Sequence, residues 1–202
     1  MKLIGSYSSP YVRKISVILL EKGIIFEFIN RINSDGEDIV TRYNPLNKVP
    51  VLVADDTSVW FDSPVIAAYL EALDIAPALV PADPLAARYM LQVEALADGL
   101  LDAATLLSHE LKKKPDQQNE EDMVALRGKI TRSLDWLEQQ LEAGKITAQP
   151  LTVGTIAIGC AMGFLNRRRI AQGWCVDHPR LIRLVESLFQ RESFVRSEPD
   201  AS

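Results

Sequence analysis

The stretch Val49-Pro50-Val51-Leu52 places a proline immediately before a short apolar strand, and Phe61-Asp62-Ser63-Pro64 follows a few residues later. Proline has no N–H for a sheet ladder, so its position is best explained by a cis Val49–Pro50 peptide bond, with the backbone of Val49 facing a ligand. An extended peptide can pair with such a backbone edge. The second motif is typical of a helix cap and first turn, and a helix N-terminus attracts a carboxylate. The two motifs together predict a site for a small, charged, extended peptide.

The residues around these two motifs alternate between strand and helix patterns. Ser9-Pro10 opens an amphipathic segment that Gly23 ends, which predicts the first helix. Strands are expected at 2–6, 24–29, 51–53 and 59–61, a short helical segment at 41–45 and a longer helix at 63–73. Because a helix connects the first two strands, we expect them to be parallel, and we expect the last two to form a hairpin.

A segment with three prolines and no clear periodicity, residues 75–84, predicts a linker between two domains. Beyond it the pattern is helical throughout, with helices expected at 85–112, 120–143, 152–169 and about 179–189. The 152–169 helix is apolar nearly all round, so we expect it to be buried at the centre of its domain. The sequence therefore predicts an α/β domain at 1–76 followed by an all-α domain at 84–202.

The composition is that of an ordinary globular protein, with 48% hydrophobic residues, 24% charged residues and a formal net charge of −5. Proteins that bind nucleic acid are usually basic, so nucleic acid is not expected as a partner. The N-terminus lacks the features of a signal peptide, and the apolar run at 152–165 is too short to span a membrane. Cys160 and Cys175 form no Cys-x-x-Cys pair and no cluster with histidine. We therefore expect no metal site, no membrane partner, two buried thiols and a cytoplasmic location.

Three motifs carry a resemblance that covers essentially the whole chain. They are Ser8-Ser9-Pro10-Tyr11-Val12-Arg13-Lys14, Asn44-Pro45-Leu46-Asn47-Lys48-Val49-Pro50-Val51-Leu52 and Phe61-Asp62-Ser63-Pro64. With the proline-rich linker and the helical second half, the chain resembles the cytosolic glutathione S-transferases, most closely an uncharacterised bacterial branch with Ser-Pro at the active site. The resemblance implies a thioredoxin-like glutathione-binding domain at 1–76, and a helical domain at 84–202 that shapes the pocket for the second substrate. It also implies a homodimer.

The resemblance implies roles for six residues, with Ser9 as the catalytic residue and Lys48, Val49, Pro50, Asp62 and Ser63 as glutathione contacts. Asp62 and Ser63 would hold the γ-glutamyl end of the peptide. The backbone of Val49, before a cis Pro50, would pair with the cysteinyl part. Lys48 would reach the glycine carboxylate, and Ser9 would lie beside the sulfur. Glutathione would be a substrate, and no cofactor is expected.

Ser9 has a structural interpretation as well as a catalytic one. Serine followed by proline is a common helix N-cap, and Ser8, Tyr7 and Tyr11 are neighbouring alternatives as the hydroxyl donor. A thiol placed at a helix N-terminus beside a hydroxyl would be favoured as thiolate. Because a serine cannot form a mixed disulfide, conjugation or isomerisation is favoured over redox exchange.

One position departs from the family pattern. The buried sixth helix of the family usually begins with a Ser/Thr-x-x-Asp capping box, and the corresponding residues here are Thr152-Val153-Gly154-Thr155. Thr152 can still cap the helix, but the acidic reciprocal partner is missing. We therefore expect a loss of roughly 1 kcal/mol in folding free energy at this helix start.

Two functions are compatible with these motifs. The first is a glutathione transferase that activates the glutathione thiol for attack on a small electrophile, with detoxification as one possible role. The second is a non-catalytic scaffold on the same fold, similar to the stringent-starvation-type proteins that contact transcription machinery. The presence of all five glutathione contacts favours ligand binding, but it does not decide between catalysis and binding alone. These contacts are Lys48, Val49, Pro50, Asp62 and Ser63.

Overall fold

The computed structural model describes residues 1–32 and 36–199. Within them lies a four-stranded mixed sheet in the order β2-β1-β3-β4, formed by β1 (Lys2–Gly5), β2 (Glu27–Asn30), β3 (Val51–Val53) and β4 (Val59–Trp60). β1 pairs in parallel with β2, while β1 with β3 and β3 with β4 are antiparallel. The expected parallel pair and the expected hairpin are both confirmed.

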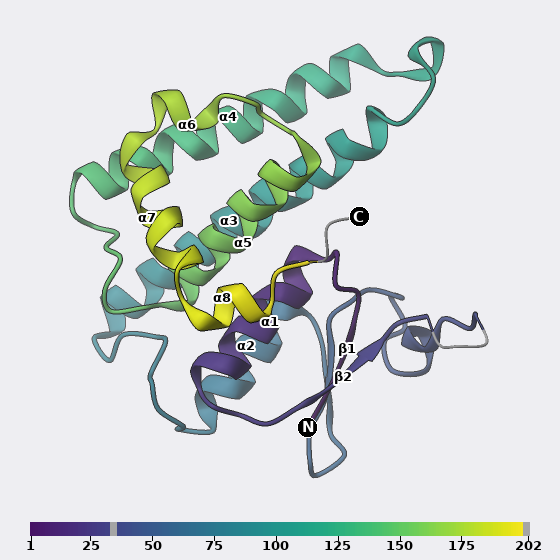
Figure 1. Ribbon diagram of the computed structural model, residues 1–202, viewed down its shortest axis with the longest axis vertical. Helices are drawn as coiled ribbons and strands as arrows, with labels where there is room; N and C mark the ends of the chain where they lie inside the picture. The colour runs from purple at the N-terminus through teal and green to yellow at the C-terminus, as the bar shows by residue number, and fades with distance from the viewer. Residues whose placement is uncertain (33–35, 200–202) are drawn as a thin grey trace. The chain divides into compact units, whose positions relative to one another are not determined.

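Two helices pack beside each other in the same unit as this sheet (Figure 1). α1 (Pro10–Glu21) connects β1 to β2, and α2 (Ser63–Ala72) follows β4. A short 3₁₀ helix, η1 (Ile39–Arg42), lies between β2 and β3 and buries Val40 against Ile4 and Val51. Gly5 ends β1 where α1 approaches closely, because a Cβ at this position would lie 2.6 Å from the methyl groups of Val12.

The chain divides into two compact units, Met1–Ala82 together with Gln190–Ser202, and Asp83–Phe189. This division differs from the expected helical domain at 84–202, whose last three residues lie outside the described ranges. The difference arises from α8 (Glu192–Arg196), which packs on α1. Phe194 of α8 is only 1% exposed, and its carbonyl accepts a hydrogen bond of 3.0 Å from the Arg13 guanidinium. The apolar side chain and this bond hold the C-terminal segment to the first unit.

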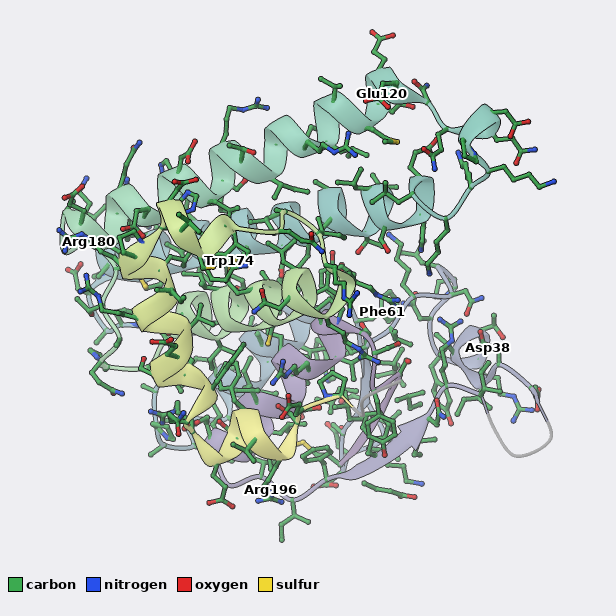
Figure 2. The ribbon with its side chains drawn as sticks, turned by 45° about the horizontal axis from the view of Figure 1, so that its top comes forward. Asp38, Phe61, Glu120, Trp174, Arg180 and Arg196 are labelled. Atoms are coloured by element: carbon green, nitrogen blue, oxygen red, sulfur yellow. The ribbon has the colours of Figure 1, made fainter. Side chains whose placement is uncertain are left out.

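The second unit is helical, as expected. It contains α3 (Pro84–Glu110), the 3₁₀ helix η2 (Pro115–Gln117), α4 (Glu120–Glu142), α5 (Val153–Arg168), α6 (Trp174–Asp177) and α7 (Pro179–Phe189). α5 is buried along nearly its whole length and packs on α3, which confirms the expected central helix. Gly154 permits this close packing, because a Cβ there would lie 2.9 Å from the Met90 carbonyl oxygen. The short α6 was not expected; its Trp174, labelled in Figure 2, donates a 2.9 Å hydrogen bond to Asn166 Oδ1.

The start of α5 corrects the expectation of an incomplete capping box. Thr152 Oγ1 accepts a hydrogen bond from the Thr155 N–H at 3.2 Å, and Thr155 Oγ1 accepts one from the Thr152 N–H at 3.0 Å. The box is therefore complete, with a threonine hydroxyl in place of the expected carboxylate. The expected loss of about 1 kcal/mol therefore does not apply, because the Thr155 hydroxyl accepts from the Thr152 N–H that a carboxylate would otherwise satisfy.

The two cysteines differ in environment. Cys160 is buried in α5 as expected, whereas Cys175 is exposed in α6, so the expectation of two buried thiols is wrong for Cys175. The four residues of α6 are too short to bury more than one face, and Trp174 occupies that face. Among the described helices, none is both long enough and apolar enough to cross a membrane.

Candidate ligand-binding site

The sheet register brings three loops of the first unit to one edge. Ile4 pairs with Val51 and Leu52 pairs with Trp60, so the end of β1, the start of β3 and the end of β4 are adjacent. The loop after β1 leads to Ser9, the loop before β3 carries Lys48 to Pro50, and the loop after β4 leads through Phe61 to Asp62. The six residues singled out in the sequence therefore come from three loops that leave the same edge of the sheet.

Ser9 is the N-cap of α1, as predicted. Its Oγ accepts a hydrogen bond from the Val12 N–H at 3.4 Å, and Pro10 occupies the first turn. Its side chain is half-buried at the helix N-terminus, where the partial positive charge of the helix dipole favours an anion. The cap is confirmed, and the catalytic role of Ser9 stays a prediction.

The Val49–Pro50 peptide bond is cis, as expected. Pro50 is buried directly before β3, Val49 is half-buried and Lys48 is exposed. Asn44, whose side chain is buried and only 2% exposed, makes hydrogen bonds to the backbone of residues 46–48, which precede Val49. Asn44 Nδ2 donates a 2.9 Å hydrogen bond to the Lys48 carbonyl, and Asn44 Oδ1 accepts one from the Leu46 N–H at 2.9 Å.

Asn44 and Arg31 position this loop, although neither is among the six predicted site residues. Arg31 forms an ion pair with Asp38, which is labelled in Figure 2, and also donates a 3.1 Å hydrogen bond to Asn47 Oδ1. The hydrogen bond from Arg31 holds the pKa of Asp38 below its ordinary value, so this pair stays charged at neutral pH. The Asn44-Pro45 dipeptide is a turn signal that marks Asn44, whereas no local signal links Arg31 to residue 47.

At the start of α2, Asp62 is the N-cap and its side chain accepts a hydrogen bond from the Ser63 N–H. The carboxylate is exposed, but Ser63 is only 1% exposed. Its Oγ is buried and has no hydrogen-bond partner among the residues that the structure describes. A buried hydroxyl without a partner costs about 1–3 kcal/mol, so Ser63 Oγ is a candidate contact for a ligand.

Together these groups offer a helix N-terminus that can bind an anion, an exposed carboxylate, an exposed lysine and a buried hydroxyl with no partner in the described part of the chain. This combination is suited to a zwitterionic ligand with two carboxylates and one ammonium group. Within the described ranges, no three histidine, cysteine, aspartate or glutamate side chains are grouped so that they could hold a metal ion.

Comparison with known proteins gives consistent results across sequence and structure. The family model described as "Glutathione S-transferase, N-terminal domain" matches residues 8–73. The chain is 52% identical over 199 residues to the "Uncharacterized GST-like protein YibF" of Escherichia coli K12, covering 98% of both. The crystal structure of a glutathione S-transferase from Methylobacillus flagellatus with glutathione bound is 32% identical, with a TM-score of 0.89 and 98% of both chains covered. A glutathione transferase family member from Pseudomonas fluorescens with bound S-(propanoic acid)-glutathione is also 32% identical, with a TM-score of 0.86 and full coverage of both chains.

Proposed function

The chain belongs to the glutathione S-transferase superfamily, and on that premise we propose that it is a glutathione transferase whose first unit binds glutathione and activates its thiol. The observation that carries the proposal is the buried Ser63 Oγ at the start of α2, which has no hydrogen-bond partner among the described residues. This hydroxyl lies at the same sheet edge as Ser9 and Val49. A glutathione molecule would give the hydroxyl a carboxylate to which it can donate.

We assign one part of glutathione to each loop. The γ-glutamyl carboxylate accepts hydrogen bonds from Ser63 at the N-terminus of α2, and the exposed Asp62 carboxylate accepts from the γ-glutamyl ammonium. The backbone of Val49 pairs with the cysteinyl residue, as an extended peptide pairs with a strand edge. Lys48 lies in the exposed loop before Pro50 and reaches the glycine carboxylate. Both charged ends of the peptide then have a partner of opposite charge.

Ser9 activates the thiol in this proposal. Its Oγ already accepts the Val12 N–H, so its own hydrogen remains available to donate to the sulfur. This bond and the N-terminus of α1 both favour the thiolate over the thiol, which lowers the thiol pKa. The thiol proton leaves to solvent, and the sulfur then attacks an electrophilic carbon. The glutathione and S-(propanoic acid)-glutathione bound in the two related structures support a conjugating chemistry.

The experiment compares Ser9→Ala with Ser8→Ala, using 1-chloro-2,4-dinitrobenzene as the electrophile. We expect Ser9→Ala to lower kcat by about 10-fold or more, because a donor to the developing anion is lost. Glutathione affinity should change little, and the pH profile of kcat/KM should shift upward toward the pKa of a free thiol. Equal turnover of Ser9→Ala and wild type, or a loss confined to Ser8→Ala, would remove the role assigned to Ser9.

Superfamily membership also leads us to propose a cytoplasmic homodimer that contributes to detoxification. Light scattering of the purified protein should then give about twice the 22.5 kDa mass of one chain. Glutathione binding without turnover of any electrophile would instead favour the non-catalytic scaffold.

A further inference from the structure

The helical unit contains a pocket of its own. A cavity of about 420 Å³ opens between the end of α3, the helix α4 and the residues that follow α5. We call this cavity the α3–α4 pocket. Its volume is within the range of small-molecule sites. All of its lining residues belong to the helical unit, whereas the six residues assigned to glutathione belong to the first unit.

The buried part of the α3–α4 pocket is aliphatic. Leu107 of α3, Ile130 of α4 and Ile170 after α5 line the pocket, and all three are buried. Ile170 is held in place by the turn that ends α5, because its N–H donates a 3.0 Å hydrogen bond to the Leu165 carbonyl. These three side chains offer apolar contact and no hydrogen bonds, so they suit an apolar group of a ligand.

The exposed part of the same pocket is positive. Arg127 and Arg169 line it, and none of the described lining residues is acidic. Arg127 Nη1 lies 3.6 Å from Glu120 Oε1, in an exposed ion pair of the kind that contributes little. Arg169 forms no ion pair within the described part of the chain. Two positive charges therefore border the pocket with little neutralisation by the protein itself.

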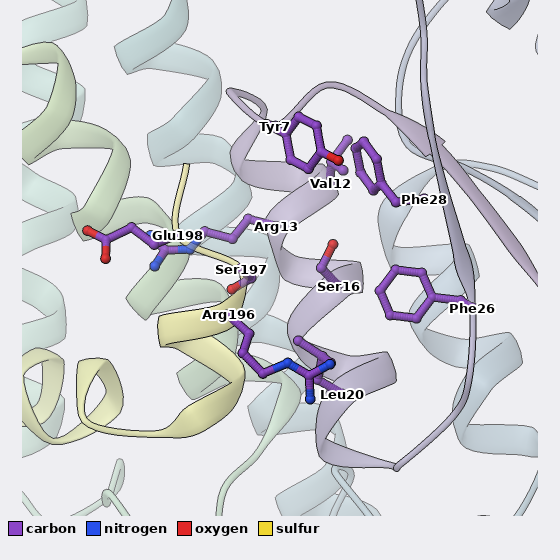
Figure 3. A pocket seen from close by; sticks show the side chains of 10 residues that line it. All are labelled: Tyr7, Val12, Arg13, Ser16, Leu20, Phe26, Phe28, Arg196, Ser197 and Glu198. Carbon is purple, nitrogen blue, oxygen red and sulfur yellow. The ribbon is translucent and has the colours of Figure 1, made fainter. Parts of the chain in front are cut away.

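The pocket along α1 of the first unit has a different charge. Glu198 lines it together with Arg13 and Arg196 (Figure 3). Arg13 donates a 3.0 Å hydrogen bond to the Phe194 carbonyl, and Arg196 Nη1 lies 3.3 Å from Glu192 Oε1. Because its cations have partners in the protein and an acid lines the same pocket, it does not favour an anion as the α3–α4 pocket does.

The backbone that carries Arg169 adopts a conformation that favours glycine. Arg169 and Ala171 have φ angles of 54° and 53°, in the left-handed region where a Cβ is unfavourable. Arg169 is also the C-cap of α5, a position at which a left-handed residue is usually glycine. Arg167 and Arg168 already supply positive charge to the last turn of α5. Helix stability therefore does not explain an arginine at position 169, and strained residues of this kind cluster at ligand sites.

We propose that the α3–α4 pocket binds a phosphate monoester of a small apolar alcohol or phenol. The apolar group packs against Leu107, Ile130 and Ile170, and the phosphate accepts hydrogen bonds from Arg127 and Arg169. A phosphate monoester carries a charge of about −2 at neutral pH, so it balances the two arginines. A carboxylate or a sulfate ester carries one negative charge and leaves one arginine unbalanced. The volume of the pocket limits the apolar group to a small ring system or a short chain.

Titration of 1-naphthyl phosphate into the purified protein, without glutathione, tests the proposal. Two comparison ligands each lack one feature, since 1-naphthyl sulfate has the same ring and a similar shape but a single negative charge, and inorganic phosphate has no ring. We expect saturable binding of 1-naphthyl phosphate. Each comparison ligand should bind about tenfold more weakly or worse, because a charge-assisted hydrogen bond or the apolar contact is lost.

Arg169→Gly separates ligand binding from a role in ending the helix. Glycine relieves the left-handed backbone, so the Tm should equal or exceed that of wild type, while the affinity for 1-naphthyl phosphate falls about tenfold or more. The matched control is Arg168→Gln. Arg168 does not line the pocket and its guanidinium lies 5.6 Å from the Phe164 ring centroid, so this variant should keep wild-type binding. Arg127→Gln changes a different helix and should also weaken binding.

The proposal is overturned if 1-naphthyl phosphate shows no saturable binding to wild type, or if the sulfate or inorganic phosphate binds equally well. Wild-type affinity in Arg169→Gly, or an equal loss in Arg168→Gln, also overturns it. If Arg169→Gly lowers the Tm, Arg127→Gln decides the proposal in the same way. Because glutathione is left out of these titrations, their outcome is independent of the transferase function.

Discussion

Several single residues serve both as helix caps and as candidate ligand contacts. Ser9 and Asp62 are N-caps, so their contribution to helix stability is enough to explain their presence without a ligand. Ser63 differs from them because its hydroxyl is buried and has no partner within the described part of the chain. A purely structural serine at a first helical turn would turn its hydroxyl to a neighbouring backbone group or to water. For this reason Ser63, rather than Ser9, carries the argument for a ligand.

Glu21 gives a prediction about stability and pH at the scale of one residue. Hydrogen bonds from Arg191 hold the pKa of Glu21 below its ordinary value of 4.5, although burial raises it. Its folded pKa is thus below its unfolded pKa, so its stabilising effect is present above pH 4.5 and is lost as the pH falls through the folded value. Glu21→Gln should lower the free energy of unfolding by about 1–3 kcal/mol at pH 7.

Urea denaturation at pH 7 and pH 3 measures this effect. The difference between Glu21→Gln and wild type should be smaller at pH 3 than at pH 7. The exposed Glu27, whose carboxylate lies 3.8 Å from Lys2 Nζ, provides the control Glu27→Gln, which should change stability little at either pH. A difference between Glu21→Gln and wild type that is the same at both pH values would contradict the assigned ion pair.

Among the elements, the sequence predicted the regular helices and strands well because each has a strong periodicity or cap. It also predicted the cis bond before β3, because Pro50 precedes an apolar strand. It did not predict α6 or α8, which are four and five residues long and have too little length for a periodic pattern. It placed the residues beyond 189 in the helical domain, because the contact that decides otherwise joins Arg13 to Phe194, which are 181 residues apart in the sequence.

For the candidate site, too, the sequence predicted the residues in local motifs but not the residues that support them. The three motifs identify the residues that line the sheet edge, because each motif combines a cap or a proline with a strand end. The supporting residues Asn44 and Arg31 bond to loop residues, and their partners follow only from the folded backbone.

The cap of α5 gives a prediction at the element scale. Thr155 is only 1% exposed, and its hydroxyl accepts the Thr152 N–H in place of an acidic residue. Thr155→Val keeps the shape but leaves that buried N–H without its partner, so it should lower the free energy of unfolding by about 1–2 kcal/mol. Thermal denaturation should show a lower Tm, while the same change at the exposed Thr131 of α4 should not. Equal Tm values for both variants would contradict the proposed capping box.

At the scale of the whole molecule, the C-terminal segment completes the first unit although it follows the helical unit in sequence. Phe194 is buried beside α1, and the Arg13 guanidinium lies 5.5 Å from its ring centroid. Phe194→Ala should therefore destabilise the first unit by about 3–5 kcal/mol, the usual cost for a buried phenylalanine.

Hydrogen exchange measures where this loss occurs. The amides of α1 should exchange faster in Phe194→Ala than in wild type, with a smaller effect on α5 in the other unit. Val195→Ala removes a neighbouring side chain that is 57% exposed, so it should leave the exchange of α1 unchanged. Unchanged protection of α1 in Phe194→Ala would show that α8 does not stabilise the first unit.

The central claim is that the first unit binds glutathione through the start of α2, and calorimetric titration of glutathione tests it most directly. The comparison is between wild type, Ser63→Ala and the control Ser133→Ala, which removes an exposed hydroxyl of α4 that donates to the Lys129 carbonyl. We predict saturable binding to wild type and to Ser133→Ala, and binding about tenfold weaker or more to Ser63→Ala, because a hydrogen bond to a carboxylate is lost. No heat of binding to wild type, or equal affinity for Ser63→Ala and wild type, would contradict the account.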